Sequence, residues 1–250
     1  MTCSELAATW LTAIGTLATA IVAVVTAIIA VVIARRQEEW RRERYHPTLG
    51  VTANIAPPDC LKIPMKLVNP HTRQVIDEAA TYYLRAKITN TGTEAAKNVE
   101  VYAKSLYRLQ GETRELIRTF PPMTLVWSNR ADLTYLPILA PHSDRHCDIA
   151  HIIEPSKREM WGQNDGTRPF AEAEIPPFPL PPNDTALSFD LKIKPLTRGY
   201  ILAPGTYSLE IEVSAENAEA IRKNLRIELD GRWEDSESTM LGQLVKMRLE

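Results

Sequence analysis

Charge is absent from the first part of this chain after its fifth residue. No Asp, Glu, Lys or Arg occurs between Glu5 and Arg35, and residues 6–34 are mainly Ala, Val, Ile, Leu and Thr. A helix rises about 1.5 Å per residue, so this run would span roughly 43 Å, more than the roughly 30 Å of hydrocarbon in a bilayer. We therefore predict one transmembrane helix over residues 6–34, with the lipid bilayer as its first partner.

Positive charge is also missing before the apolar run, which argues against a cleaved signal peptide. Residues 1–5 contain one acid and no Lys or Arg. A signal peptide instead begins with a positive segment and has an apolar core of only about 7–15 residues. Small residues near the end of the run resemble a cleavage site, so cleavage is the alternative. We expect residues 1–5 to form a short external N-terminus.

Arginine is concentrated directly after the run, within a segment that we predict to be a juxtamembrane helix over residues 35–46. Five arginines lie there with one interfacial tryptophan, namely Arg35, Arg36, Arg41, Arg42 and Arg44 with Trp40. Because Lys and Arg mark the cytoplasmic side of a span, we predict an external N-terminus and a cytosolic C-terminal part. Binding of anionic lipid is an alternative role for these arginines, although three nearby glutamates dilute their charge.

Hydroxyl and small residues recur along the apolar run at steps of three and four residues. They share one helical face, which consists of Thr12, Gly15, Thr16, Thr19, Ala23 and Thr26. Such a face permits close helix approach and hydrogen bonds between helices, which predicts packing on another membrane helix, including a homo-oligomer. Alternatively, each hydroxyl bonds the carbonyl four residues earlier and faces lipid.

Cysteine and net charge are both low in the rest of the chain. Cys3, Cys60 and Cys147 are too few and too scattered for a disulfide framework, which suits a reducing cytosol. Beyond residue 45, 24 basic residues face 27 acidic ones. This balance leaves no electrostatic footprint for nucleic acid.

Alternation of polar and apolar residues dominates the C-terminal part and predicts strands. It occurs over residues 84–89, 99–104, 187–194, 207–214 and 225–230. One apolar face per strand is typical of antiparallel sheets that are solvated on one side, and short helices are expected near residues 156–161 and 235–242. The sequence thus predicts a mainly β chain, with an antiparallel immunoglobulin-like β-sandwich and loop insertions over residues 47–250.

One stretch resembles a known kind of module. Residues 84–103 read LRAKITNTGTEAAKNVEVYA, in which a strand, Asn-x-Gly, small residues and Asn-Val precede a second strand. This pattern resembles bacterial immunoglobulin-like modules of the CARDB type, which are usually extracellular. The whole layout resembles uncharacterised bacterial single-pass membrane proteins, which implies the bacterial inner (cytoplasmic) membrane as the location. The resemblance implies a fold and no activity.

Sequence motifs for catalysis are missing: there is no serine elbow, phosphate loop, dinucleotide fingerprint or Cys-x-x-Cys pair. We therefore predict a protein without enzymatic activity or cofactor. The densest polar cluster would place four side chains on one strand face, namely His142, Asp144, His146 and Asp148. Imidazole and carboxylate suit zinc or manganese. Alternate residues of a strand are about 6.6 Å apart, however, so a solvated face is the competing interpretation.

The Pro-rich residues 175–182 are expected to adopt polyproline II, as a loop between sheets or as a ligand for an aromatic groove. Trp127, Trp161 and Trp233 are expected to pack in the core or loops rather than to stack on a sugar or peptide.

These observations favour a membrane-anchored cytosolic binding or scaffolding module that recruits a protein partner. The first alternative is an oligomerising membrane effector with a sensing sandwich. The second is a metal-dependent enzyme that uses His142 and His146.

Overall fold

The computed structural model describes residues 16, 19–37, 46–69, 71–130, 132–158, 180–181, 183–195 and 199–250. Its contacts divide the chain into two compact units, Met1–His46 and Pro47–Glu250. The second unit, called the β-unit below, contains the strands that the structure describes.

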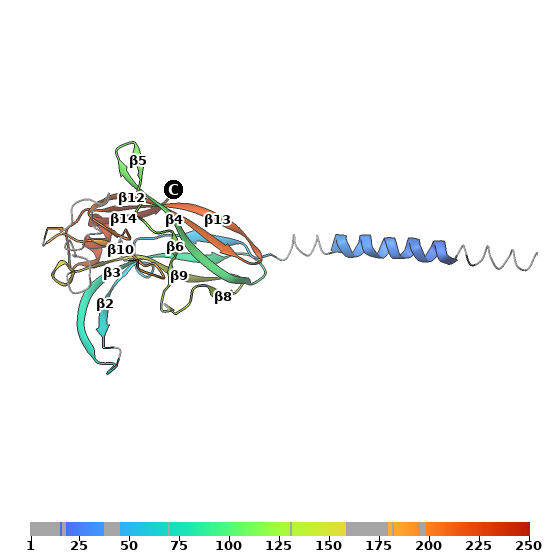
Figure 1. Ribbon diagram of the computed structural model, residues 1–250, viewed down its shortest axis with the longest axis horizontal. Helices are drawn as coiled ribbons and strands as arrows, with labels where there is room; N and C mark the ends of the chain where they lie inside the picture. The colour runs from blue at the N-terminus through green and yellow to red at the C-terminus, as the bar shows by residue number, and fades with distance from the viewer. Residues whose placement is uncertain are drawn as a thin grey trace, which may run out of the picture. The chain divides into compact units, whose positions relative to one another are not determined.

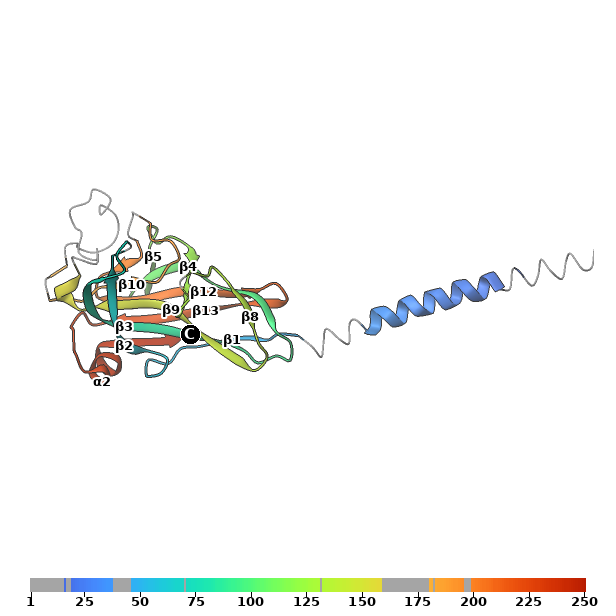
Figure 2. The same cartoon turned by 90° about the horizontal axis from the view of Figure 1, so that it is seen from below.

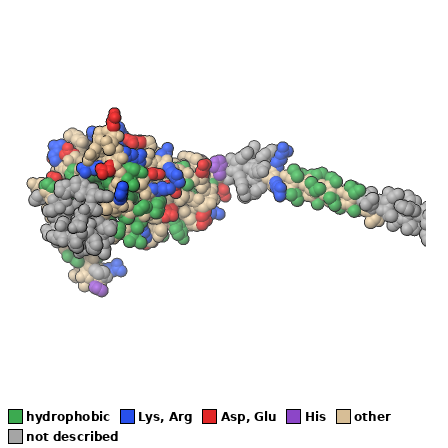
Figure 3. All heavy atoms as spheres, turned by 45° about the horizontal axis from the view of Figure 1, so that its top comes forward, with side chains coloured by type: hydrophobic (Ala, Val, Ile, Leu, Met, Phe, Trp, Pro, Cys, Tyr) green, Lys and Arg blue, Asp and Glu red, His purple; other side chains and the backbone are tan. Residues whose placement is uncertain are grey.

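The first unit contains an apolar helix over Thr19–Gln37. Its described side chains are exposed, and most of them are hydrophobic (Figure 3). Among the described residues this one helix is long and apolar enough to cross a membrane, a criterion that a signal sequence also meets. The helix continues past residue 34 into the segment predicted to be a juxtamembrane helix, so Arg35 and Arg36 lie in its last described turn. Residues 38–45 fall outside the described residues.

The β-unit consists of two antiparallel sheets (Figures 1 and 2). Sheet 1 has the order β1 (Leu49–Thr52), β3 (Val75–Asn90), β9 (Ser143–Ile153), β10 (Leu187–Phe189) and β11 (Ile201–Leu202), with β2 (Leu61–Val68) beside β3 and β7 (Val126–Trp127) beside β9. Sheet 2 has the order β14 (Val245–Leu249), β13 (Ala218–Leu229), β12 (Gly205–Ala215), β4 (Ala96–Gln110) and β5 (Thr113–Leu116), with β6 (Met123–Thr124) and β8 (Leu136–Leu139) beside β4. The prediction of a mainly β chain with an antiparallel sandwich is confirmed.

The core lies between the sheets and follows the period of two that the sequence shows. Strand β3 buries Tyr82, Leu84, Ala86 and Ile88 completely. Alternate residues of β12, in the other sheet, are also fully buried. Burying each large apolar side chain contributes about 1.5–3 kcal/mol. The removal of these apolar side chains from water is therefore the main force that holds the two sheets together.

A tyrosine fixes the entry into β12. The Tyr207 hydroxyl donates to the Ala203 carbonyl at 2.8 Å, and the ring is fully buried. A tyrosine that bonds the backbone just upstream of its strand is a feature of immunoglobulin-like sandwiches.

The strand predicted over residues 187–194 is wrong beyond its first three residues. Strand β10 ends at Phe189, Leu191 makes only an isolated bridge to Leu125, and Ile193 is 65% exposed. The reason is that the backbone stops hydrogen-bonding to β9 after Asp190. The Lys192 amide instead donates to the Thr124 carbonyl.

Short helical turns overlap both segments where helices were expected. η1 covers Pro155–Lys157, while residues 159–161 of that expected helix fall outside the described residues, and α2 (Glu237–Thr239) runs into η3 (Met240–Leu244). Ser236 is the N-cap of α2 and accepts a hydrogen bond from the Thr239 amide.

Strand β2 forms an edge of sheet 1. β9 begins to pair with β3 only at Thr81, so in the described chain the start of β3 pairs with β2 alone and the two strands project as a hairpin (Figure 1). Pro64 lies in the middle of β2 and has no N–H, while the Lys62 amide donates to Glu237 Oε1 at 2.7 Å. The edge is thus poorly suited to pair with a further strand.

Candidate functional site

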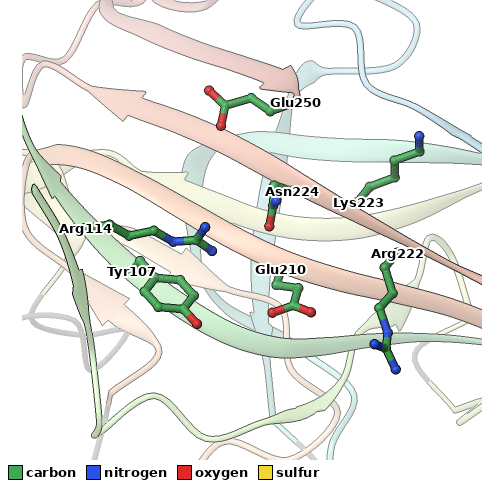
Figure 4. Close-up of a pocket in the computed structure, with 7 residues that line it drawn as sticks. All are labelled: Tyr107, Arg114, Glu210, Arg222, Lys223, Asn224 and Glu250. Carbon is green, nitrogen blue, oxygen red and sulfur yellow. The ribbon is translucent and has the colours of Figure 1, made fainter. Parts of the chain in front are cut away.

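A groove is hollowed into the outer face of sheet 2. It has a volume of about 510 Å³, within the range of ligand-binding clefts. Its lining comes from β5, β4, β12 and β13 and from the residue that follows β14 (Figure 4), and consists of Tyr107, Arg114, Glu210, Arg222, Lys223, Asn224 and Glu250. We call it the sheet-2 groove.

The strand register places the polar side chains on this face. Glu210 lies opposite Asn224 in the β12–β13 pair, and Ile211 and Leu225 point to the core. The alternation that predicts strands therefore also gives sheet 2 a polar outer surface.

The acidic residues around the groove have partners on the same sheet. Glu210 Oε2 accepts from the Ser105 hydroxyl at 2.7 Å. Glu212 Oε2 lies 2.6 Å from Arg222 Nε and 3.0 Å from Lys104 Nζ. The hydrogen bond from Arg222 makes the largest contribution to lowering the pKa of Glu212, and the hydrogen bond from Lys104 acts in the same direction.

At one end of the groove, Glu250 Oε1 lies 3.8 Å from Arg226 Nη1 and 4.0 Å from Arg248 Nη2. Its charge is therefore partly compensated by the strands beside it, although such exposed pairs contribute little to stability.

One cation of the groove differs from the rest. The Arg114 guanidinium lies 3.8 Å from the centre of the Tyr107 ring, a cation–π contact. Lys223 pairs with the core-facing Ile211, and its side chain points away from those of Arg222 and Asn224 (Figure 4). Within the described ranges, Arg114 has no carboxylate within ion-pair distance, so its charge is uncompensated.

A second polar cluster is buried on the outer face of sheet 1. His151 Nδ1 lies 2.8 Å from Asp190 Oδ1, and both residues are buried. The Tyr83 ring lies 5.8 Å from the His151 ring. Asp148 accepts a hydrogen bond from the Ser128 hydroxyl, and burial raises its pKa to about 6, with the charge of Asp190 acting in the same direction.

This cluster corrects two predictions from the sequence. Ser188 and Asp190 were expected on a solvated face and are buried. The regular alternation that places Asp148 on one face with His142, Asp144 and His146 would put the odd-numbered His151 on the other, but a β-bulge between the pairs Leu84–Ala150 and Arg85–Asp148 puts Asp148 and His151 on the same side. The extra residue, Ile149, packs into the core together with the next residue, Ala150. The apolar pattern gives no sign of this bulge.

The four metal candidates do not come together. His142 precedes β9 in a left-handed backbone conformation (φ 53°), and Asp144 is exposed. His146 Nε2 lies 2.8 Å from Asp59 Oδ1. The other carboxylate oxygen of Asp59 accepts a hydrogen bond from the Asn54 amide. In the part of the chain that the structure describes, no three His, Cys, Asp or Glu side chains are arranged to hold a metal ion.

The tryptophans and the Pro-rich stretch are only partly described. Trp127 is buried in the core. Trp233 packs against Tyr82, with ring centres 5.1 Å apart. Leu180 lies in a small apolar cluster with Ile201. Trp161, residues 175–179 and Pro182 fall outside the described residues.

The predicted helix-packing face is described at Thr16, Thr19, Ala23 and Thr26. The Thr26 hydroxyl donates to the Val22 carbonyl at 2.8 Å. At this position the bond to the preceding turn, which was the alternative, is present. Outside the described residues lie two members of that face and the later arginines with their tryptophan, namely Thr12, Gly15, Trp40, Arg41, Arg42 and Arg44.

Comparisons of the chain with models of known protein families, with curated proteins and with solved structures found no match. The resemblance to CARDB-type modules therefore stays a prediction.

Proposed function

We propose that this protein is a membrane-tethered binding module whose β-unit recruits a protein partner. The observation that carries the proposal is the sheet-2 groove, an open cleft of about 510 Å³ lined by charged and amide side chains on a rigid sheet. Rigid strands hold side chains in place more accurately than loops do, which favours recognition.

The apolar helix Thr19–Gln37 supports a membrane location. We further propose that the helix spans the bacterial inner membrane with the N-terminus outside and the β-unit in the cytosol. Arg35 and Arg36 in the last helical turn, and the arginines that follow them in the sequence, support this orientation.

Location is tested by fractionation and by reporter fusions to the full chain. The protein should stay in the membrane pellet after alkaline carbonate extraction. Fluorescent protein fused after Glu250 should glow, whereas alkaline phosphatase at the same place should be inactive. Release by carbonate would contradict the anchor, and the reverse reporter result would contradict the orientation.

Recruitment is tested by crosslinking in the host cell, followed by capture of the full chain from solubilised membranes. The control keeps residues 1–46 and replaces the β-unit with a fluorescent protein. We expect at least one protein to be recovered with the full chain and lost with the control. Identical recoveries from the two would refute a binding role for the β-unit.

A further inference from the structure

We propose that the sheet-2 groove binds an extended, carboxylate-bearing peptide segment of a protein partner, and that Arg114 receives the carboxylate. This inference rests on the proposed binding function and names the ligand chemistry of the groove.

Arg114 is held ready for such a contact. Its guanidinium lies over the Tyr107 ring, with Cζ 3.8 Å from the ring centre, so the aromatic face holds the cation in place. The N–H groups of the guanidinium can bind a carboxylate through two parallel hydrogen bonds.

Arg114 provides the contact for an anionic ligand. Glu210 accepts only from the neutral Ser105 hydroxyl among the described residues and keeps its charge, whereas Glu212 is shared by Arg222 and Lys104. Arg114 has no carboxylate partner among the described residues. A ligand carboxylate would supply the missing negative charge.

The dimensions of the groove favour a peptide over a single small anion. Its lining extends from Arg114 on β5 to Glu250 at the end of β14, across five neighbouring strands (Figure 4). At about 4.8 Å between strands this distance is roughly 19 Å, the length of about six extended residues. The Asn224 amide lies between the ends, and it offers one acceptor and two donors to a peptide backbone.

The test exposes full-length protein, in micelles of an uncharged detergent, to an immobilised library of random hexapeptides. We expect the bound peptides to be enriched in Asp or Glu at one or more positions. Arg114→Gln should abolish this enrichment and weaken binding of the best peptide at least about tenfold, because it removes a charge-assisted bidentate contact. Arg114→Lys should bind with intermediate affinity, because it keeps the charge and loses the fork.

The matched control is Arg145→Gln. Arg145 is an exposed arginine of β9 whose one side-chain hydrogen bond to a described residue goes to the Asp144 carbonyl, and this variant should bind like the wild type. Peptides without acidic enrichment, or unchanged binding by Arg114→Gln, would overturn the inference. Arg114-dependent binding of inorganic phosphate or of phosphatidylglycerol vesicles without peptide selection would overturn it as well.

The two proposals fail in different ways. A cellular partner still captured by the Arg114→Gln chain would overturn this inference and leave the binding function standing. Peptide selection by the groove without any captured partner would instead support this inference and refute recruitment in the cell.

Discussion

The side-chain amide of Asn90 donates to the backbone oxygen of Leu139 at 3.1 Å, across 49 residues of sequence. It also donates to the Glu94 carbonyl at 2.7 Å, while its oxygen accepts from the amides of Thr48 and Gly92, each at 3.1 Å. This fully buried side chain therefore joins the approach to β1, the β3–β4 turn and the end of β8.

Asn90→Ala should lower the free energy of unfolding by about 2–4 kcal/mol, because it leaves buried backbone donors and acceptors without partners. Urea titration of the full chain in micelles measures the change. Asn224→Ala, at a half-buried asparagine of the outer face, is the matched control and should cost less than about 0.5 kcal/mol. Equal losses in the two variants would contradict the role given to Asn90.

Asp148 should make the β-unit less stable as the pH rises. Its folded-state pKa of about 6 lies above the ordinary value of 3.8, so between those values the folded state holds the proton more tightly. The penalty is absent below about pH 4 and complete above about pH 6, where it amounts to roughly 3 kcal/mol.

Asp148→Asn should remove this component, and the variant should gain stability relative to the wild type between pH 4 and pH 7. Parallel urea titrations across that range measure the difference. Asp144→Asn changes an exposed carboxyl of the same strand and should show no such gain. A constant difference between Asp148→Asn and the wild type at every pH would disprove the assignment.

The thiols of Cys60 and Cys147 should resist modification in the folded protein. Both are fully buried, and burial raises the pKa of Cys60 to about 11 and that of Cys147 well above its usual value. Because the thiolate is the reactive form, a Cys3→Ser chain should react with an aromatic disulfide reagent at least about 100-fold faster in urea than when folded. Adding Ser156→Cys, at an exposed position, should create one rapidly reacting thiol.

Tyr207→Phe should destabilise the β-unit by about 1 kcal/mol, because the Ala203 carbonyl loses its buried donor while the ring stays in the core. Tyr102→Phe, at a half-buried tyrosine of β4, provides the comparison and should be nearly neutral. Thermal unfolding measures both. A larger effect at Tyr102 than at Tyr207 would count against a role for this hydroxyl in holding the entry to β12.

Local patterns predicted those parts of the fold that local physics determines. Alternation located the strands around Leu84 and Leu209, because burial on one face of a sheet imposes a period of two. The same pattern failed at Asp148 and Asp190: a bulge moves the half-buried Asp148 to the face of His151, and a backbone departure leaves Asp190 buried. Neither event has a marker in the residue types.

The groove was beyond sequence reasoning for a related reason. Arg114 lies in a short exposed strand without apolar alternation, and it meets Tyr107 only because the turn at Gly111 folds β5 back on β4. The turn was recognisable from its Gln-Gly pair. The cation–π contact and the lack of a carboxylate partner depend on three-dimensional neighbours.

Pro64 has a consequence for the membrane anchoring proposed above. Tethering would confine chains to two dimensions and keep their β-units at high local concentration, the condition under which free sheet edges pair and aggregate. The missing N–H of Pro64 and the engagement of the Lys62 amide by Glu237 interrupt the β2 edge at two nearby positions. Crowded copies would thus meet through side chains rather than through backbone hydrogen bonds, which keeps their encounters reversible.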